Sequence, residues 1–470
     1  MAIETKKGVS ATHPEYDKAL PKWKRCLDFA AGEDAVHAAR TTYLPKLKGE
    51  SDDDYKSRLA RTPFFNATWR TISGLKGMAF RKAPTVVAPP SFQPYRDNID
   101  QAGTSLNLWA QDFFQHILTT GRGAALIDFP SVANPGSMTK AQADALGLRP
   151  SIQQYKAESV TNWRFTRINN ETVLEMITLC ESVRAGDDEF EHKQEKRWRV
   201  LDLVVVDGVI MYRQRLYRQR DGKDEQIGGD VYPQMNNRPL SRIPVVLFGV
   251  DSSRTTVDEP PLIDLVNMNW HHYQVSADYE HGCHFSGLPT LFVWGAQLDD
   301  GQKLYIGSKA AQVLPNPDGH AEYVEVVSDF GALRANLDAK KSEMAVLGAR
   351  MLEGQKTAVE SAETLKRRGA GEESQLASMA DVFSANMTQA LRLLAEWAGV
   401  PGDVSYQMPS DYGVAGLTAQ ELTALVSAWQ AGAISEQTLF DNLQRGEVVA
   451  EGVTFEQEQE RIRSGSMTGA

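Results

Sequence analysis

The amino-acid sequence predicts an α+β protein, and three observations lead to that class. Apolar residues recur every three or four positions up to about Pro90 and again from Asp258 to Val400, which is the spacing of one helix face. Between about Val160 and Phe248 the pattern changes to an alternation rich in β-branched and aromatic residues, as in strands. With 42% hydrophobic and 24% charged residues, the chain of 470 residues can bury a sizeable core. We expect roughly two to four structural units.

Helices account for most of the predicted N-terminal part. The first two are predicted at Pro14 to Ala30 and at Ala35 to Tyr43. Ser51, followed by three aspartates, is a strong N-terminal cap signal for a third helix. A fourth carries one apolar stripe, which consists of Phe65, Trp69, Ile72, Leu75 and Met78.

A further helix is predicted at Thr104 to Thr120, followed by a strand at Ala124 to Phe129. Between them stands Gly121-Arg122-Gly123, a spacing that nucleotide-binding loops also use. Here it follows a helix and precedes a strand, the wrong order for a dinucleotide fingerprint, and the third glycine is missing. We interpret it as a tight helix–strand turn.

The β-rich region is predicted to contain a hairpin turn at Asp207-Gly208. Its predicted strands are Val173 to Arg184, Arg197 to Val206, Val209 to Arg218 and Ile243 to Phe248. Aromatic residues and arginines are mixed from Tyr212 to Arg218, as on some surfaces that bind nucleic acids. Since successive residues of a strand point to opposite faces, we favour a strand with one solvated face.

The first long helix of the central part is predicted to begin with Asp258 as its N-cap and with Pro260 and Pro261 in its first turn. Gly282 and Gly287-Leu288-Pro289 are predicted to stop it. Its apolar face comprises Leu262, Val266, Trp270, Tyr273 and Ala277. Short strands are predicted to follow at Thr290 to Trp294, Ala311 to Leu314 and Tyr323 to Val327.

A second long helix is predicted from about Ala332 to Leu352. After a short connection, a capping box at Thr357 and Glu360 starts another helix, and a break at Gly369-Ala370-Gly371 leads into a long amphipathic seam. That seam consists of Leu376, Met379, Phe383, Met387, Leu391, Leu394 and Trp397. Three short helices are predicted after Val400, and their start signals are Thr418 with Glu421, Ser435, and Thr454 with Gln457.

The net charge of −11 disfavours a protein that holds DNA in a static complex, because such binding relies on clustered Lys and Arg. It is compatible with a protein that lets DNA slide past. No Lys or Arg occurs from Asp258 to Phe285, where the acids are Asp258, Glu259, Asp264, Asp278 and Glu280. The second long helix carries a net charge close to zero, so the sequence supports one acidic helix and not a wholly acidic surface.

Three widely separated cysteines, Cys26, Cys180 and Cys283, argue against a disulfide framework and for a reducing compartment. The N-terminus lacks the apolar segment of a signal peptide, and no apolar run has the roughly 18 residues of a membrane span. We expect a cytosolic soluble protein that does not contact membranes.

A possible metal site is the group of His271, His272, His281, Cys283 and His284. His281 and His284 are three residues apart, a spacing that can bind zinc from one helix face. The usual zinc-ligand spacings are absent, so we interpret these residues as polar or interface residues and expect no metal and no cofactor.

Catalytic motifs are missing as well. The sequence contains no phosphate-binding loop with its Lys, no Gly-x-Ser-x-Gly elbow and no His-Glu-x-x-His. We therefore expect no catalytic residues and no enzymatic activity; an ATP-driven motor in particular would need the phosphate loop.

Two features resemble tailed-phage portal proteins. The run from Phe65 to Pro84, FNATWRTISGLKGMAFRKAP, resembles the N-terminal helix motif of one branch of that family. The order of helix, short β module, helix, loop and long helix resembles the family's core. The resemblance implies a portal-type fold with these parts: a wing at 1–257, a first stem helix at 258–285, a clip at 286–328, a second stem helix at 329–352, a tunnel loop at 353–357, a long bent helix at 358–400 and a helical crown at 401–470.

The same resemblance implies a ring, usually a dodecamer, at one vertex of a phage head. DNA would enter through it during packaging and leave through it during ejection. The implied partners are further copies of the chain, the terminase large subunit, head–tail adaptor proteins, the major capsid or scaffolding protein, and double-stranded DNA inside the channel. The implied location is the virion, with assembly in the host cytoplasm.

On this interpretation the tunnel loop that approaches DNA consists of Glu353, Gly354, Gln355, Lys356 and Thr357. The charged positions of the stem are Asp264, Asp278, Glu280, Lys340 and Lys341. A ring of acidic helices would repel phosphates and keep DNA from sticking while it moves. Two alternatives stay open: another oligomeric head or tail protein without a DNA channel, and an enzyme with an unrecognised site.

Overall fold

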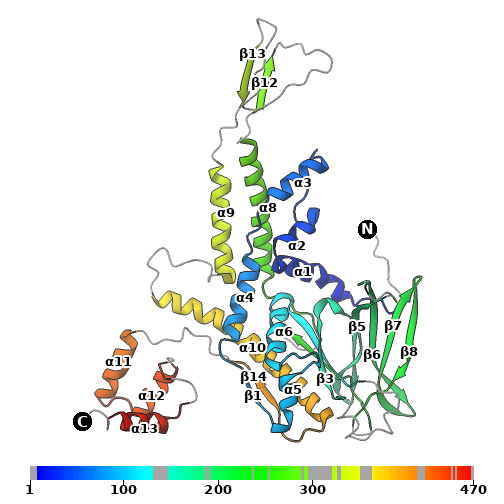
Figure 1. Ribbon diagram of the computed structural model, residues 1–470, viewed down its shortest axis with the longest axis vertical. Helices are drawn as coiled ribbons and strands as arrows, with labels where there is room; N and C mark the ends of the chain where they lie inside the picture. The colour runs from blue at the N-terminus through cyan, green and yellow to red at the C-terminus, as the bar shows by residue number, and fades with distance from the viewer. Residues whose placement is uncertain are drawn as a thin grey trace. The chain divides into compact units, whose positions relative to one another are not determined.

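A computed structural model of the chain describes residues 8–130, 147–185, 190, 192–235, 238–251, 255–286, 290–294, 320–324, 330–349, 362–409, 419–445, 448–449 and 453–466. The fold is mixed α and β, as predicted (Figure 1). The chain divides into two compact units. The first consists of Met1–Ala358 and Ser378–Met408, and the second of Val359–Ala377 and Pro409–Ala470.

The N-terminal helices form largely as predicted. They are α1 (Pro14–Ala31), α2 (Glu33–Ala38), α3 (Asp52–Arg61) and α4 (Ala67–Ala79). Ser51 caps α3 by accepting a hydrogen bond from the amide of Asp54, so the predicted signal is confirmed. The helix predicted to reach Tyr43 ends early, because Arg40 adopts a positive φ of 49° and only a short 3-10 turn (Arg40–Thr42) follows.

The buried centre of the first unit contains a three-stranded sheet of order β11-β2-β3. Its strands are β2 (Arg122–Asp128), β3 (Ser151–Lys156) and β11 (Val245–Gly249), with α6 (Leu106–Thr120) against β2. Phe113 and Phe114 of α6, Phe248 of β11 and Phe383 of α10 (Ala362–Ala398) stack edge-on or tilted against one another. These aromatic contacts join segments far apart in the sequence.

The glycine pair around Arg122 is the predicted helix–strand turn. Gly121 ends α6 in the left-handed conformation at φ 74°, and a Cβ there would lie 2.7 Å from the carbonyl oxygen of Glu259. A Cβ on Gly123 would lie 2.8 Å from the ring of Phe113. Close packing therefore requires glycine at both positions.

A five-stranded antiparallel sheet of order β4-β5-β6-β7-β8 forms the rest of the β-rich region. Its strands are β4 (Val160–Ile168), β5 (Glu171–Arg184), β6 (Gln194–Val206), β7 (Val209–Arg220) and β8 (Lys223–Val231). The predicted hairpin between β6 and β7 is confirmed, with positive φ at both Asp207 and Gly208. Strands β3, β4 and β8 were not predicted from the sequence. Short helical and strand segments complete the unit: η2 (Pro90–Phe92), α5 (Gln93–Asp97), η4 (Ala157–Ser159), β9 (Gln234–Met235) with β10 (Arg238–Pro239), and β1 (Thr85–Val87) with β14 (Ser405–Gln407).

Helix α8 (Ile263–Ser286) differs from the prediction at its start and near its end. Asp258 is not its N-cap, because its carboxylate accepts hydrogen bonds from the amides of Val250 and Asp251 instead. Gly282 does not interrupt the helix, which continues to Ser286. Beyond α8, β12 (Thr290–Trp294) and β13 (His320–Val324) pair antiparallel, while the predicted strand at Ala311 to Leu314 lies outside the described residues.

Helix α9 (Gly331–Met344) is shorter than predicted. From Ala345 to Ala349 the chain forms a π-helical turn, within which Gly348 adopts φ 121°. The α-helix predicted to reach Leu352 therefore ends at Met344, because this backbone conformation is incompatible with regular helix. The predicted break at Gly369-Ala370-Gly371 is also wrong, since α10 is continuous through these residues.

The second unit contains the N-terminal part of α10 and three short helices, α11 (Ala419–Gln430), α12 (Glu436–Arg445) and α13 (Phe455–Ser466). Ser435 caps α12 through the amide of Thr438. Thr454 and Gln457 form the predicted capping box, each side chain accepting from the other residue's amide. The rings of Phe440 and Phe455 pack edge-on between α12 and α13.

Candidate functional site

The candidate site is the antiparallel helix pair α8–α9, from which the predicted stem charges project. Helix α8 is fixed to the N-terminal helices by hydrogen bonds along its length. The Asn269 amide accepts from the hydroxyl of Thr68 at 2.9 Å and donates to the carbonyl of Phe65 at 2.8 Å. The indole of Trp270 donates to the carbonyl of Tyr43 at 2.8 Å. Since Val266, Tyr273 and Ala277 are also fully buried in this contact, α8 belongs rigidly to the body of the first unit.

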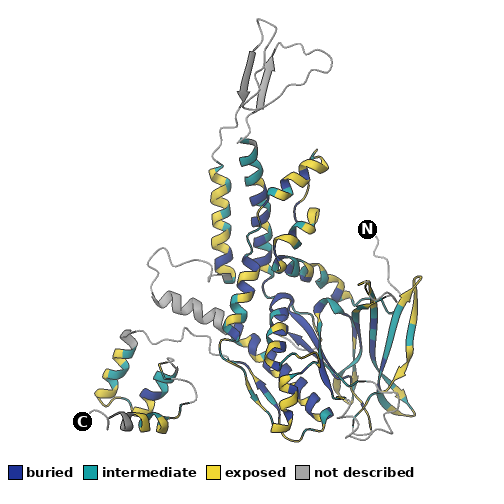
Figure 2. Ribbon diagram, viewed as in Figure 1, coloured by how far each residue is buried: buried dark blue, intermediate teal, exposed yellow. Residues whose placement is uncertain are grey.

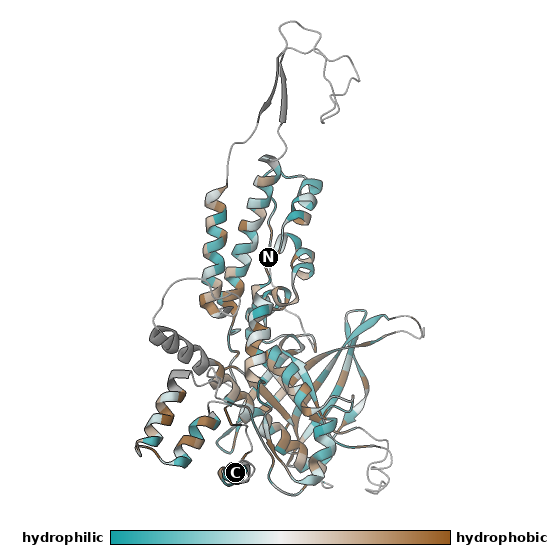
Figure 3. Ribbon diagram, turned by 60° about the vertical axis from the view of Figure 1, so that its left-hand side comes forward, coloured by the Kyte–Doolittle hydropathy of each residue, from teal (hydrophilic) through white to brown (hydrophobic). Residues whose placement is uncertain are grey.

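Helix α9 is held along one side only. Leu333, Leu337 and Lys340 are half-buried and Met344 is fully buried, and these four recur every three or four residues toward α8. Met344 packs with Ala67 and Leu265 in a small apolar cluster. All the remaining residues from Gly331 to Glu343 are exposed (Figure 2). Hydrophilic residues follow much of this exposed surface (Figure 3).

The predicted stem charges differ in their surroundings. Asp264 and Asp278 are exposed on α8, and Glu280 is half-buried. Lys340 is half-buried on the side of α9 that faces α8. Lys341 is engaged within its own chain: its ammonium lies 5.6 Å from the centre of the Phe65 ring and 3.8 Å from a carboxylate oxygen of Asp338. Lys341 therefore has partners within its own chain, which the sequence did not indicate.

The tunnel-loop residues Glu353, Gly354, Gln355, Lys356 and Thr357 lie outside the described residues, and so does most of the clip segment.

The histidine group does not converge on a metal site in the described part of the chain, where no three His, Cys, Asp or Glu side chains come together as ligands. His271 is exposed, whereas His272 is 4% exposed and tilts against the Phe65 ring at 5.5 Å. Among the described residues neither ring nitrogen of His272 has a hydrogen-bond partner. Burial, assisted by Lys341 and Lys340, lowers the pKa of His272 to about 4, so the ring is neutral near neutral pH.

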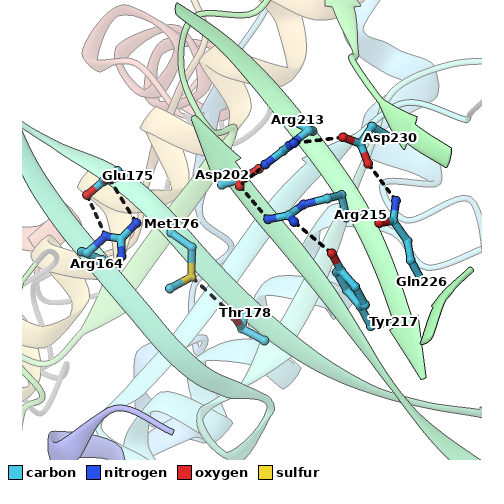
Figure 4. Close-up of polar contacts among 10 residues, drawn as sticks. All are labelled: Arg164, Glu175, Met176, Thr178, Asp202, Arg213, Arg215, Tyr217, Gln226 and Asp230. Carbon is cyan, nitrogen blue, oxygen red and sulfur yellow. Dashed lines mark hydrogen bonds and ion pairs between the residues drawn. The ribbon is translucent and has the colours of Figure 1, made fainter. Parts of the chain in front are cut away.

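In the mixed aromatic and arginine strand β7, Arg213 and Arg215 lie on one face, where both meet carboxylates (Figure 4). Asp202 accepts from Arg213 at 2.8 Å and from Arg215 at 2.7 Å, and Asp230 accepts from Arg213 at 2.9 Å. Gln214, between the two arginines, is 9% exposed on the other face. The positive charges are thus neutralised, which supports a half-solvated strand over a nucleic-acid surface.

A half-buried polar group that no local sequence pattern indicated joins the two larger sheets. Arg199 of β6 donates to Glu181 at 2.7 Å and to Asp128 of β2 at 3.2 Å. Tyr155 of β3 donates to the same Glu181 at 2.5 Å. Burial alone would lower the pKa of Arg199, but the neighbouring Tyr155 and Glu181 raise it overall. No local motif could have revealed the group, because it comes from four strands.

A cavity of about 430 Å³ is lined by residues that include Lys76, Asp100, Leu108 and Asp112. The groups of the Arg199 cluster, where pKa shifts are large, do not line this cavity. Burial would raise the pKa of Asp100 in the cavity lining, but hydrogen bonds from Thr104 and Ala102 lower it overall.

Comparison with known proteins gives three results. Residues 261–398, which contain the helix pair, match a family described as a domain of unknown function, DUF4055. No curated protein matches the chain. Among solved structures, a chain from the virion of a native gene transfer agent (GTA) particle is 13% identical with a TM-score of 0.40, over 86% of this chain and 96% of that one. A chain from the neck of the native GTA particle computed with C12 symmetry is 12% identical with a TM-score of 0.39, over 82% and 92%. These TM-scores are too low to establish a common fold. None of the described helices is long and apolar enough to cross a membrane.

Proposed function

We propose that this chain is a phage portal protein, a subunit of a ring-shaped channel at one capsid vertex through which DNA is packaged and ejected. The observation that carries the proposal is the one-sided attachment of α9. Helix α9 contacts the rest of its chain along one side, and its remaining residues from Gly331 to Glu343 are exposed. Such a helix fits a position between neighbouring copies in a ring.

The order of elements supports the same function. An antiparallel helix pair with a β hairpin between its two helices, followed by a long helix, is the order expected of stem, clip and return helix. The run from Phe65 to Pro84 that resembles the portal motif contains α4, which borders this pair. The lack of Lys and Arg from Asp258 to Phe285 suits a surface past which DNA slides.

The functional segments follow from this proposal. Residues 353–357 would form the tunnel loop, with Lys356 as its cation, and residues 286–328 would form the clip. The clip would bind terminase during packaging and head–tail adaptor proteins afterwards. The major capsid or scaffolding protein would contact the ring from outside, and the assembled protein would reside in the virion.

Native mass measurement and electron microscopy of the purified protein test the proposal. A ring with an axial hole is expected, and twelve copies of the 52.0 kDa chain would have a mass of about 624 kDa. A protein that stays monomeric at high concentration would overturn the proposal. A closed oligomer without a hole would favour another structural protein of the head or tail.

A deletion tests the tunnel loop separately. Removing Gly354 to Lys356 is expected to impair DNA packaging or retention while rings still assemble. Normal DNA handling by rings that lack these residues would contradict the assignment, as would a failure of the variant to form rings.

A further inference from the structure

Two oppositely charged residues lie at the hairpin end of the helix pair. Asp278 of α8 and Arg334 of α9 are both exposed, and among the described residues neither side chain forms an ion pair or a hydrogen bond, although Asp278 acts electrostatically on Arg58 and His281. The neighbouring Lys341, by contrast, is satisfied by Asp338 and Phe65. The two charges are therefore available to a partner.

Asp278 and Arg334 lie at the same height along the pair. Helices α8 and α9 run antiparallel, and Gly282 of α8 is in contact with Phe330, which directly precedes α9. Asp278 is four residues from Gly282, and Arg334 is four residues from Phe330. Both therefore lie about 6 Å from that contact, in the same direction. Arg334 also acts electrostatically on Tyr279, the neighbour of Asp278, which agrees with this register.

The two charges nevertheless lie on opposite flanks of the pair. Asn269 and Lys341 mark one flank, because both contact Phe65 at the start of α4. Arg334 precedes Lys341 by seven residues and so lies on this flank. His271 follows Asn269 by two residues, about 200° around α8, and so lies on the other flank. Asp278 follows His271 by seven residues and shares that second flank.

From this arrangement we infer that Asp278 of one copy pairs with Arg334 of the next copy around the ring. The inference rests on the proposed function, since it assumes a ring whose axis is parallel to the helix pair. Rotation about such an axis leaves the height of each residue along the axis unchanged, and it brings the Asp278 flank of each copy against the Arg334 flank of its neighbour. A cyclic interface needs two such different, complementary surfaces on each subunit.

Cross-linking between two singly substituted chains tests the pair. In a background with Cys180→Ser and Cys283→Ser, one chain carries Asp278→Cys and the other, with a larger tag, carries Arg334→Cys; Cys26 is buried. The two chains are co-assembled and treated with a short bis-maleimide, which joins two cysteine sulfur atoms over a longer distance than a disulfide bond does. Cross-linked dimers of mixed size can arise only between subunits, and they are expected in assembled rings.

A matched control replaces Asp278→Cys by Asp264→Cys. Asp264 is also exposed and on the same flank, but it lies 14 residues and about 21 Å further along α8. Several-fold fewer mixed dimers are expected from it. Rings that form normally but give no excess of the 278–334 product would overturn the inference and leave the portal function standing. If the chain with only Cys180→Ser and Cys283→Ser forms no rings, both the inference and the portal function are overturned.

Charge exchange provides a second measurement. Asp278→Arg or Arg334→Asp alone places like charges across the interface and is expected to lower the yield of rings several-fold at low salt. The two changes together restore opposite charges and should recover the yield. If the double variant assembles no better than the single variants, the pairing is contradicted.

Discussion

The ring of Phe330 packs directly against the backbone of Gly282. A Cβ at position 282 would lie 2.6 Å from Cε1 of Phe330, closer than side chains tolerate. Phe330 itself adopts a left-handed backbone conformation at φ 48°. The contact joins the end of α8 to the start of α9, so it sets how closely the two helices approach at the hairpin end.

Gly282→Ala is expected to lower the free energy of unfolding by about 1–3 kcal/mol, because the added methyl group must displace the Phe330 ring. Chemical denaturation of the purified chain measures this. Gly77→Ala is the matched control, since Gly77 also lies within a helix but has nothing within 4 Å of a Cβ. The control should be neutral or stabilising by up to about 1 kcal/mol. Equal effects at the two positions would refute the role of the contact.

Glu50→Gln is expected to be strongly destabilising. Glu50 accepts hydrogen bonds from Arg58 at 2.7 and 2.9 Å, and the two side chains are 5% and 2% exposed. Removing the carboxylate charge leaves the Arg58 guanidinium buried without its counter-ion, at a cost of about 3–5 kcal/mol. Glu175→Gln disturbs the exposed pair with Arg164 and should cost less than about 1 kcal/mol. Similar losses in the two variants would contradict this reasoning.

His272 is expected to make folding pH-dependent between about pH 6.5 and pH 4. Burial lowers its pKa to about 4 in the folded state, so an unfolded chain takes up the proton at a higher pH. The contribution of the neutral His272 ring to the free energy of unfolding is complete above pH 6.5. It falls by up to about 3 kcal/mol as the pH drops to 4. His272→Leu should flatten this part of the stability profile, whereas the exposed control His271→Leu should not. Identical profiles for both variants and the unmodified chain would rule the effect out.

Asp202→Asn combined with Asp230→Asn is expected to turn the face of β7 into a basic surface. Arg213 and Arg215 would lose the carboxylates that they contact. Affinity for double-stranded DNA should rise and should fall steeply with added salt, because counter-ion release then favours binding. Glu225→Gln, which frees only Arg218, serves as the control and should change the affinity less. Fluorescence anisotropy over a salt series measures both; unchanged affinity in the double variant would show that these arginines are not accessible to phosphates.

Local sequence patterns predict most of the long elements of this chain. The helical spacing locates α1, α6, α8 and α9, and the strand β12 has the predicted bounds Thr290–Trp294. The caps at Ser51, Ser435 and Thr454 are also confirmed, because a cap depends on residues three positions apart. In these places the information needed is contained within a few residues.

The predictions fail where contacts outside the local pattern decide the outcome. Gly282 looks like a helix stop but serves the contact with Phe330, and Asp258 looks like an N-cap but binds the amides of Val250 and Asp251. The Arg199 group was missed because its members are remote in the sequence; Arg199 and Asp128 are 71 residues apart. For the same reason the charges that were predicted as one stem set have different surroundings in the folded chain: Glu280 and Lys340 are half-buried, whereas Asp264, Asp278 and Lys341 are exposed.

The approach of Gly282 to Phe330 affects how much the stretch between them can vary in length. The contact holds the two ends of this stretch next to each other, so it forms a loop that is already closed. Lengthening such a loop costs little additional entropy, because the entropy of loop closure grows only with the logarithm of the loop length. Replacing this stretch with a sequence of different length is therefore expected to leave the fold of the helix pair unchanged.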